Sequence, residues 1–279
     1  MNTFTAQAFS KDIYSLAESP FYDYRTKTLS WVDITQGIFY TAENDGKDLK
    51  KSYSFGQAIG AAVPTEKEGL YVIAATDGLY VYENNSSRLV KTLSDFYKPY
   101  QRSNDAKADP AGRLWFGSIV NDEHPAGGNL FCLDKGTISC RQADTKIANG
   151  MAWSSDCKKF YFSDSLCHAV FVYDYDFASG NISNCKVLFK VEDGLPDGMC
   201  IDADDNLWVA IWAGSRIEKR SGKDGSLLAT VNVDAKNATS CCFFGPNFEK
   251  LFITSSEGLF TCTVDAKGRP CTLLTQKIF

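Results

Sequence analysis

Two carboxylates and two carboxamides recur 11 to 13 residues before an aromatic residue. They are Glu18, Asn104, Asn149 and Asp197, which precede Trp31, Trp115, Tyr161 and Trp208 in that order. Oxygen-only ligand sets suit hard cations such as Ca²⁺, Mg²⁺ or Mn²⁺. The chain has only 2 histidines, which excludes a His-rich zinc site but not zinc held by oxygens. If the fold brings these four side chains together, facing carboxylates require a cation between them. We therefore expect one divalent metal ion, Ca, Zn, Mg or Mn.

A simpler interpretation competes for each residue. Asn and Asp before a strand are most often turn formers that bind their own backbone. For any one of the four, this interpretation is the better one. Their occurrence at equivalent positions favours a shared site, although the same offset falls on Ile59 and Gly60 in a second repeat and on Thr239 and Ser240 in a sixth.

The elements that would position these residues repeat six times along the chain. The repeated segments are "TLSWVDI", "GLYVIAA", "RLWFGSI", "KFYFSDS", "NLWVAIW" and "KLFITSS". Their aromatic residues are separated by 40, 44, 46, 47 and 44 residues, and most segments are followed by a second short apolar strand. Short strands punctuated by turns predict an antiparallel all-β protein.

A period of this length matches one four-stranded propeller blade. We predict an all-β, six-bladed β-propeller that occupies residues 1–279 as a single domain, with four antiparallel strands per blade. The strand-like segments "FTAQAFS" and "CTLLTQKIF" are expected to close the ring together. A β-sandwich is the alternative, but its strands need not recur at a fixed long period. The innermost strand should directly precede each aromatic residue, so that the four polar side chains point to the central axis.

Composition limits the classes of partner. The net charge of -5 and the pI near 5.2 argue against nucleic acid as a partner. The sequence contains no run of about 18 apolar residues and no polybasic segment, so we expect no contact with a membrane. Without a visible signal peptide we expect a cytoplasmic protein whose 10 cysteines are reduced. The sequence is silent on oligomeric state.

Several other motifs are weaker evidence for function than the four polar residues. The acidic "DADDN", Asp202 to Asn206, lacks the glycine of an EF-hand loop and is interpreted as a β-turn. No G-x-S-x-G elbow supports a serine hydrolase. Asp105 is interpreted mainly as a cap of its own segment, and the repeated aromatic residues as core packing.

Long stretches of the chain resemble the SMP-30/gluconolactonase/regucalcin family. The similar segments are "AESPFYDYRTKTLSWVDI", "RSNDAKADPAGRLWFGS", "NGMAWSSDCKKFYFSDSL", "PDGMCIDADDNLWVA" and "TSCCFFG". This resemblance implies a six-bladed propeller that binds one divalent metal and hydrolyses aldonolactones.

The resemblance also implies roles for individual residues. Glu18, Asn149 and Asp197 match metal ligands, and Asp197 also matches the general base. Arg102 and Asn104 match positions that contact substrate. A further substrate-binding acid of some relatives falls nearest to Asn121, which is followed by Asp122 and Glu123, so the acid is displaced or missing here.

The expected function is metal-dependent hydrolysis of a sugar lactone such as gluconolactone to the aldonic acid. Metal-activated water would attack the lactone, and Asp197 would accept the proton. The alternative is a regucalcin-like calcium-binding regulator with little or no enzymatic role. A third alternative, a scaffold that binds other proteins, is disfavoured by the ring of polar residues.

Overall fold

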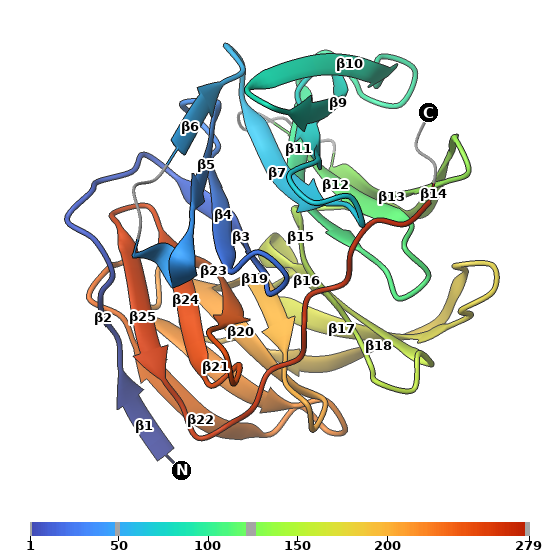
Figure 1. The fold of residues 1–279 in the computed structure, drawn as a ribbon. Helices are drawn as coiled ribbons and strands as arrows, with labels where there is room; N and C mark the ends of the chain where they lie inside the picture. The colour runs from blue at the N-terminus through green and yellow to red at the C-terminus, as the bar shows by residue number, and fades with distance from the viewer. Residues whose placement is uncertain (1, 48–50, 121–126, 277–279) are drawn as a thin grey trace.

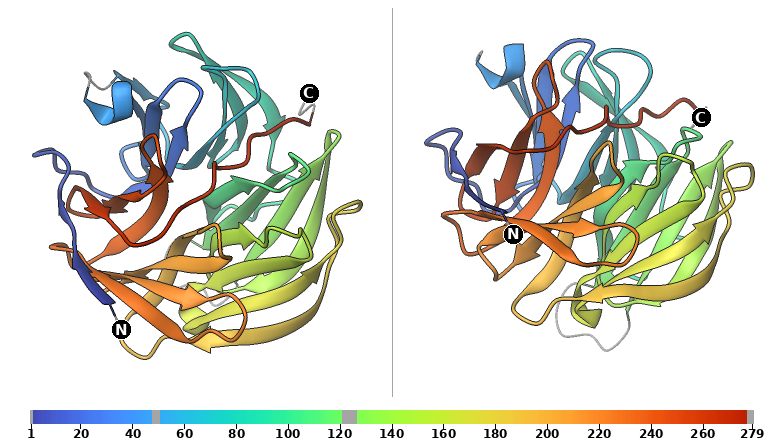
Figure 2. Two further views of the ribbon diagram at one scale, coloured as in Figure 1. Left: turned by 60° about the horizontal axis from the view of Figure 1, so that its bottom comes forward. Right: turned by 90° about the horizontal axis from the view of Figure 1, so that it is seen from below.

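Six β-sheets surround a central channel in the computed structural model, which describes residues 2–47, 51–120 and 127–276. Figures 1 and 2 show the sheets arranged as the blades of a propeller. The all-β, six-bladed architecture predicted from the repeats is confirmed.

The first three blades contain the N-terminal half of the chain. Blade one comprises β3 (Ala17–Asp23), β4 (Thr28–Asp33), β5 (Ile38–Ala42) and β6 (Lys51–Ser54). Blade two comprises β7 (Ile59–Pro64), β8 (Tyr71–Ala75), β9 (Gly78–Glu83) and β10 (Ser86–Thr92). Blade three comprises β11 (Gln101–Ala108), β12 (Leu114–Val120), β13 (Gly128–Asp134) and β14 (Thr137–Thr145).

The other three blades follow the same order, from the axis outwards. Blade four comprises β15 (Ala148–Trp153), β16 (Lys159–Asp164), β17 (Ala169–Tyr175) and β18 (Ile182–Lys190). Blade five comprises β19 (Leu195–Ile201), β20 (Asn206–Trp212), β21 (Arg216–Ser221) and β22 (Leu227–Asn232). Blade six comprises β23 (Ala238–Phe244), β24 (Lys250–Ser255) and β25 (Leu259–Thr263). Two short 3-10 helices are described, η1 (Asn44–Gly46) and η2 (Ser165–Cys167).

The ring closes by pairing strands from opposite ends of the chain. Strand β2 (Gln7–Ala8) lies antiparallel to β25 and is the fourth strand of blade six. Strand β1 (Asn2–Thr5) pairs with β22 in parallel, so blade five has a fifth strand. Closure by N-terminal and C-terminal strands is therefore confirmed.

The described part of the segment "CTLLTQKIF", residues 271–276, does not take part in that closure, contrary to the prediction. Residues 268–276, named here the C-terminal strap, instead cross one face of the propeller, as the red chain in Figure 1 shows. The strap makes a parallel bridge between Leu274 and Thr65 at the end of β7. The amide of Thr275 then donates to the carbonyl of Gly112 beside blade three. The strap binds through isolated contacts and adds no strand to a sheet.

The repeated aromatic residues all lie in the second strand of a blade and are buried, as predicted. Trp115 and Trp208 are fully buried, and each indole donates to a carboxylate in the preceding turn. Asp109 accepts from Trp115 at 2.9 Å, and Asp202 accepts from Trp208 at 3.2 Å. The "DADDN" segment is therefore a turn, as predicted, and its first carboxylate also holds the buried indole of Trp208.

Within the described residues, no helix is long and apolar enough to cross a membrane.

Candidate metal and substrate site

A β-bulge interrupts each innermost strand at the same depth in the channel. Pairing of the first two strands breaks between Ser103 and Ala106 in blade three and between Ala148 and Met151 in blade four. It breaks between Pro196 and Met199 in blade five. Bulges release residues from the alternating pattern of a strand and re-aim their side chains.

The predicted site residues lie in or beside these bulges. Asn104, Asn149 and Asp197 are all without a partner in the register of the adjacent strand. Glu18 directly precedes the bulge of blade one, where Ser19 has a φ of 50°. The bulges thus explain why polar residues recur before the aromatic landmarks.

These side chains line one cavity of about 270 Å³ at the N-terminal ends of the innermost strands. We call it the upper cavity. Its polar lining comes from Glu18, Arg102, Asn104, Asn149, Ser165 and Asp197. Its apolar lining comes from Leu16, Ile34, Ile119, Ile147, Leu195 and Trp212. The structure therefore brings together every predicted site residue except Asn121, which lies outside the described residues together with Asp122 and Glu123.

The two carboxyl groups of the upper cavity are held in an unfavourable environment. Burial raises the pKa of Glu18 well above its ordinary value, and the negative charges of Asp197 and Asp105 raise it further. Burial raises the pKa of Asp197 in the same way, and the charge of Asp105 raises it further. A hydrogen bond from Asn149 acts in the opposite direction but does not cancel the increase. A cation in this cavity would relieve the repulsion.

Two oxygen atoms in the upper cavity have no hydrogen-bond partner among the described residues. They are Oε1 of Glu18 and Oδ1 of Asn149, and both are buried. The amide of Asn149 donates to the hydroxyl of Ser165 at 3.2 Å, and that hydroxyl donates to the carbonyl of Pro196 at 2.8 Å. This chain of hydrogen bonds fixes the amide nitrogen and leaves the amide oxygen available as an acceptor.

Unpaired buried oxygens next to carboxylates fit a divalent cation. In the part of the chain that is described, no three His, Cys, Asp or Glu side chains form a metal cluster. A metal at this place therefore needs the amide oxygen of Asn149 in addition to Glu18 and Asp197. These three residues are the ligands that the family resemblance implies, and all three line the upper cavity.

Arg102 and Asn104 form the wall on the side of blade three. Arg102 donates through Nη1 to Oδ1 of Asn104 at 3.1 Å and to the carbonyl of Ser103 at 2.9 Å. The amide nitrogen of Asn104 donates to the carbonyl of Ala148 in blade four at 3.0 Å. Burial lowers the pKa of Arg102. The negative charge of Glu18 acts in the opposite direction and favours the positively charged guanidinium.

Two residues of the site were missed or misjudged at the level of sequence. Ser165 orients Asn149, but a serine after a strand carries no signal of that role. Asp105, interpreted as a cap, is instead buried in the channel at 5% exposure, where its charge acts on both Glu18 and Asp197. The bulge turns Asp105 inwards, and strand alternation alone could not predict this.

Small residues let the innermost strands approach one another at the depth of the site. A Cβ atom on Gly150 would lie 2.5 Å from the carbonyl oxygen of Asp197 and 2.9 Å from the amide nitrogen of Met199. A Cβ atom on Gly198 would collide with Ser240 of blade six. These glycines therefore set the spacing between the strands that carry Asn149 and Asp197.

Comparison with known proteins agrees with the fold. The family model described as "SMP-30/Gluconolactonase/LRE-like region" matches residues 16–257. The chain is 35% identical to a regucalcin of Xenopus laevis over 266 residues, which cover 92% of this chain and 88% of the relative.

Two solved structures have the same fold over nearly their full length. A luciferin-regenerating enzyme superposes with a TM-score of 0.90 at 28% identity, covering 97% of this chain and 99% of that one. A regucalcin of Agrobacterium tumefaciens, described as a calcium-binding protein, superposes with a TM-score of 0.89 at 24% identity and 98% coverage of both chains. The second likeness concerns the fold alone. The match of the family model over most of the sequence establishes that this chain belongs to the SMP-30/gluconolactonase family.

Proposed function

We propose that the protein is a divalent-metal-dependent lactonase that hydrolyses sugar lactones such as gluconolactone to the aldonic acid. The observation that carries this proposal is the pair of unpartnered buried oxygens on Glu18 and Asn149 beside the carboxyl group of Asp197. Membership of a family that includes gluconolactonases supports it.

Glu18, Asn149 and Asp197 would hold the ion. When bound, a divalent ion supplies a Lewis acid that polarises a carbonyl group or lowers the pKa of water. The ion could be Ca²⁺, Zn²⁺, Mg²⁺ or Mn²⁺, because oxygen ligands accept all four.

The chain's own residues supply the proton transfer. A water molecule attacks the carbonyl carbon of the lactone, and the carboxylate of Asp197 accepts its proton. The bond between that carbon and the ring oxygen then breaks, and the ring oxygen takes up the proton as a hydroxyl group. Burial raises the pKa of Asp197, and a cation beside it would lower that pKa again, so that the carboxylate would be ionised and able to accept a proton.

Arg102 and Asn104 would orient the sugar. Both line the upper cavity, and their mutual hydrogen bond fixes them relative to each other. The hydroxyl groups of an aldonolactone can both donate to the amide oxygen and accept from the guanidinium. The apolar rim beside them, which includes Leu195 and Trp212, reduces access of bulk water.

The decisive experiment is hydrolysis of gluconolactone, followed by acid release, before and after treatment with EDTA and after addition of each divalent ion. We expect activity to disappear with the chelator and to return with at least one ion. Asp197→Asn should lower kcat by about 10²–10⁴-fold, the contribution of a general base. Asp193→Asn, which neutralises an exposed carboxylate nearby, is the matched control and should leave kcat unchanged.

The outcome that contradicts the proposal is full lactonase activity in Asp197→Asn, or activity that EDTA does not affect. Tight calcium binding without hydrolysis of any aldonolactone would instead support a calcium-binding regulator. That alternative is favoured by the similarity to regucalcins.

A further inference from the structure

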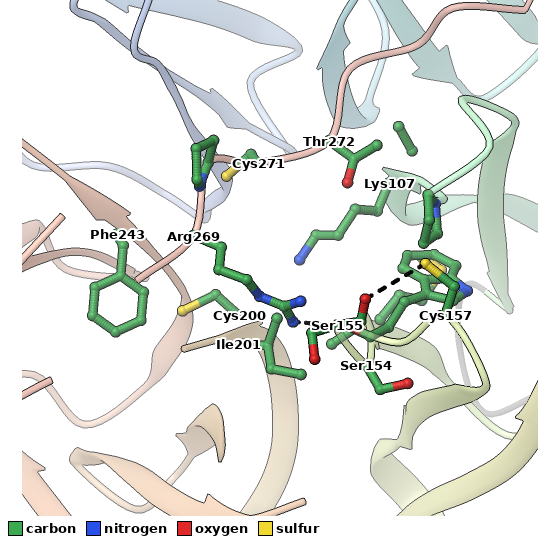
Figure 3. A pocket seen from close by; sticks show the side chains of 16 residues that line it. Lys107, Ser154, Ser155, Cys157, Cys200, Ile201, Phe243, Arg269, Cys271 and Thr272 are labelled. Atoms are coloured by element: carbon green, nitrogen blue, oxygen red, sulfur yellow. Dashed lines mark hydrogen bonds between the residues drawn. The ribbon is translucent and has the colours of Figure 1, made fainter. Parts of the chain in front are cut away.

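The opposite end of the channel holds a second cavity, which we call the lower cavity. Its volume is about 170 Å³, enough for about five or six water molecules. It lies at the C-terminal ends of the innermost strands of blades three to six, and the C-terminal strap forms one wall (Figure 3). Glu18, Asn149 and Asp197 are absent from its lining, so it is separate from the upper cavity.

The strap is fixed in the position that forms this wall. The amide of Gly268 donates to the carbonyl of Phe248 at 2.7 Å, and the amide of Ala203 donates to the carbonyl of Lys267 at 2.8 Å. A Cβ atom on Gly268 would collide with the ring of Phe243, so only glycine allows this close approach. The cavity is therefore formed by defined contacts.

Two cationic side chains reach into the lower cavity from different elements. Lys107 extends from the end of β11, and Arg269 extends from the strap (Figure 3). Nζ of Lys107 donates to the carbonyl of Met199 at 2.6 Å, which occupies one of its three protons. Among residues 2–47, 51–120 and 127–276, no carboxylate lies within ion-pair distance of Lys107.

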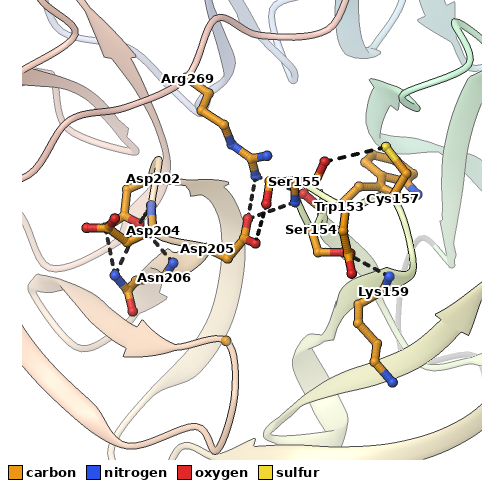
Figure 4. A network of polar contacts seen from close by, with 12 residues as sticks. Trp153, Ser154, Ser155, Cys157, Lys159, Asp202, Asp204, Asp205, Asn206 and Arg269 are labelled. Atoms are coloured by element: carbon orange, nitrogen blue, oxygen red, sulfur yellow. Dashed lines mark hydrogen bonds and ion pairs between the residues drawn. The ribbon is translucent and has the colours of Figure 1, made fainter.

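Arg269 is only partly satisfied. Its Nη2 contacts Oδ1 of Asp205 at 3.1 Å and the carbonyl of Trp153 at 2.9 Å (Figure 4). Asp205 also accepts hydrogen bonds from the amide and the hydroxyl of Ser155, so its carboxylate is divided between Arg269 and Ser155. Within the described part of the chain, Nε and Nη1 of Arg269 have no acceptor.

The remaining walls are largely apolar. They include Met151, Trp153, Ile201, Phe243 and Pro270. Thr272 on the strap adds a hydroxyl group. The lining thus combines unsatisfied cationic donors with hydrophobic surface, as ligand sites commonly do.

We propose that the lower cavity binds a small carboxylate anion with a short apolar tail, held by Lys107 and Arg269. The carboxylate would accept charge-assisted hydrogen bonds from the free protons of both side chains. The tail would pack against Trp153 and Phe243.

The charges favour an anion over a neutral or cationic ligand. Asp205 forms an ion pair with Arg269, whereas the charge of Lys107 acts on Asp105 and Glu18 only from beyond ion-pair distance. Asp105 is the nearest charged residue on the same strand, and it does not line the lower cavity. Two cationic side chains that line one cavity repel each other, so an anion that contacts both is favoured.

The test uses the full-length protein in EDTA. The chelator removes divalent ions, so that the added butyrate cannot bind to a metal in the upper cavity. Sodium butyrate is the probe, sodium chloride at equal concentration controls for ionic strength, and butanol controls for the apolar tail. We expect butyrate to bind with a Kd on the order of 1 mM. It should raise the melting temperature above the value in chloride, and butanol should not.

Variants locate the binding. Lys107→Met and Arg269→Gln should each weaken butyrate binding roughly tenfold, the worth of one charge-assisted hydrogen bond. Lys223→Met removes the same charge from an exposed site and should bind butyrate as the wild type does. Amide NMR signals of the wild type give a measurement that needs no variant. The amide signals of Ala108 and Ile201, which line the lower cavity, should shift when butyrate is added, and the amide signal of Asn149 should not.

Butyrate-dependent shifts at Ala108 and Ile201 with loss of binding in Lys107→Met establish the site. Three results would each overturn the proposal. The first is that butyrate has no effect beyond that of chloride, and the second is equal binding by Lys107→Met and the wild type. The third is that the amide shifts are confined to Asn149 and its neighbours. None of these results bears on lactone hydrolysis, which is measured with the metal present.

Discussion

Gly150→Ala tests whether the spacing of two blades controls the proposed metal site. Gly150 follows Asn149 in the bulge of β15 and faces the strand that carries Asp197. An added Cβ atom would lie 2.5 Å from the carbonyl oxygen of Asp197 and 2.9 Å from the amide nitrogen of Met199. Both neighbouring atoms belong to the backbone, so no side-chain rotation can relieve the overlap.

The size of the effect follows from these distances. Restoring an ordinary contact requires β15 and β19 to separate by about 1 Å. Overpacking of this kind costs about 1–3 kcal/mol. For a chain of this length that corresponds to a fall in Tm of about 2–6 °C. A ligand displaced by about 1 Å can cost about 10²-fold in function, so we expect metal affinity to fall by up to that factor although every ligand remains.

The assay combines thermal unfolding with metal affinity, measured by competition with a chelator. Gly258→Ala is the matched control, because its Cβ atom would lie 3.6 Å from the carbonyl of Asp12 and 3.8 Å from the ring of Phe260. That variant should melt and bind metal as the wild type does. Wild-type metal affinity in Gly150→Ala would refute the link between blade spacing and the site, and an unchanged Tm would refute the packing argument itself.

Three further predictions concern stability. Asp109→Ala removes the ion-pair partner of the buried Arg113 guanidinium, so we expect a loss of about 3–5 kcal/mol in urea unfolding; an unchanged midpoint would contradict this. Leu274→Ala truncates a strap residue that is 2% exposed and should cost about 2–5 kcal/mol by calorimetry. The lactonase rate at 25 °C should not change, because the strap lies opposite the upper cavity. In EDTA, the free energy of unfolding should fall as pH rises above the ordinary carboxyl range. The reason is that burial raises the pKa of Glu18 and Asp197 in the folded state, so the unfolded state binds fewer protons there. Saturating Ca²⁺ should remove that slope, and a flat profile in EDTA would contradict the prediction.

The repeat pattern predicted the architecture because each blade has the same buried second strand. The aromatic residue of that strand is buried in every blade, so the same packing requirement recurs in each of the six repeats. Glu18, Asn149 and Asp197 lie at similar distances in sequence from these aromatic residues because each lies in or beside a bulge of an innermost strand. Their shared position in the cavity could therefore be predicted from the sequence.

Features that depend on contacts between distant segments could not be predicted. The strap contains Leu and Thr residues, yet its described part pairs only through isolated bridges of Gly268 with Asp202 and of Leu274 with Thr65. The outer edge of β25 pairs with β2 instead. Asp105 and Lys107 alternate with apolar neighbours as surface residues do. Only closure of the ring places both inside the channel.

The pairing of β2 with β25 has a consequence for the order of folding. These strands are separated by nearly the whole chain, so the ring cannot close until almost every residue has been synthesised and the other blades have formed. Contacts of such high sequence separation are slow to form. Glu18 in blade one faces Asp197 in blade five only after closure, which makes the upper cavity one of the last features to form. A divalent ion that binds all three ligands would therefore recognise completed molecules and discriminate against open intermediates.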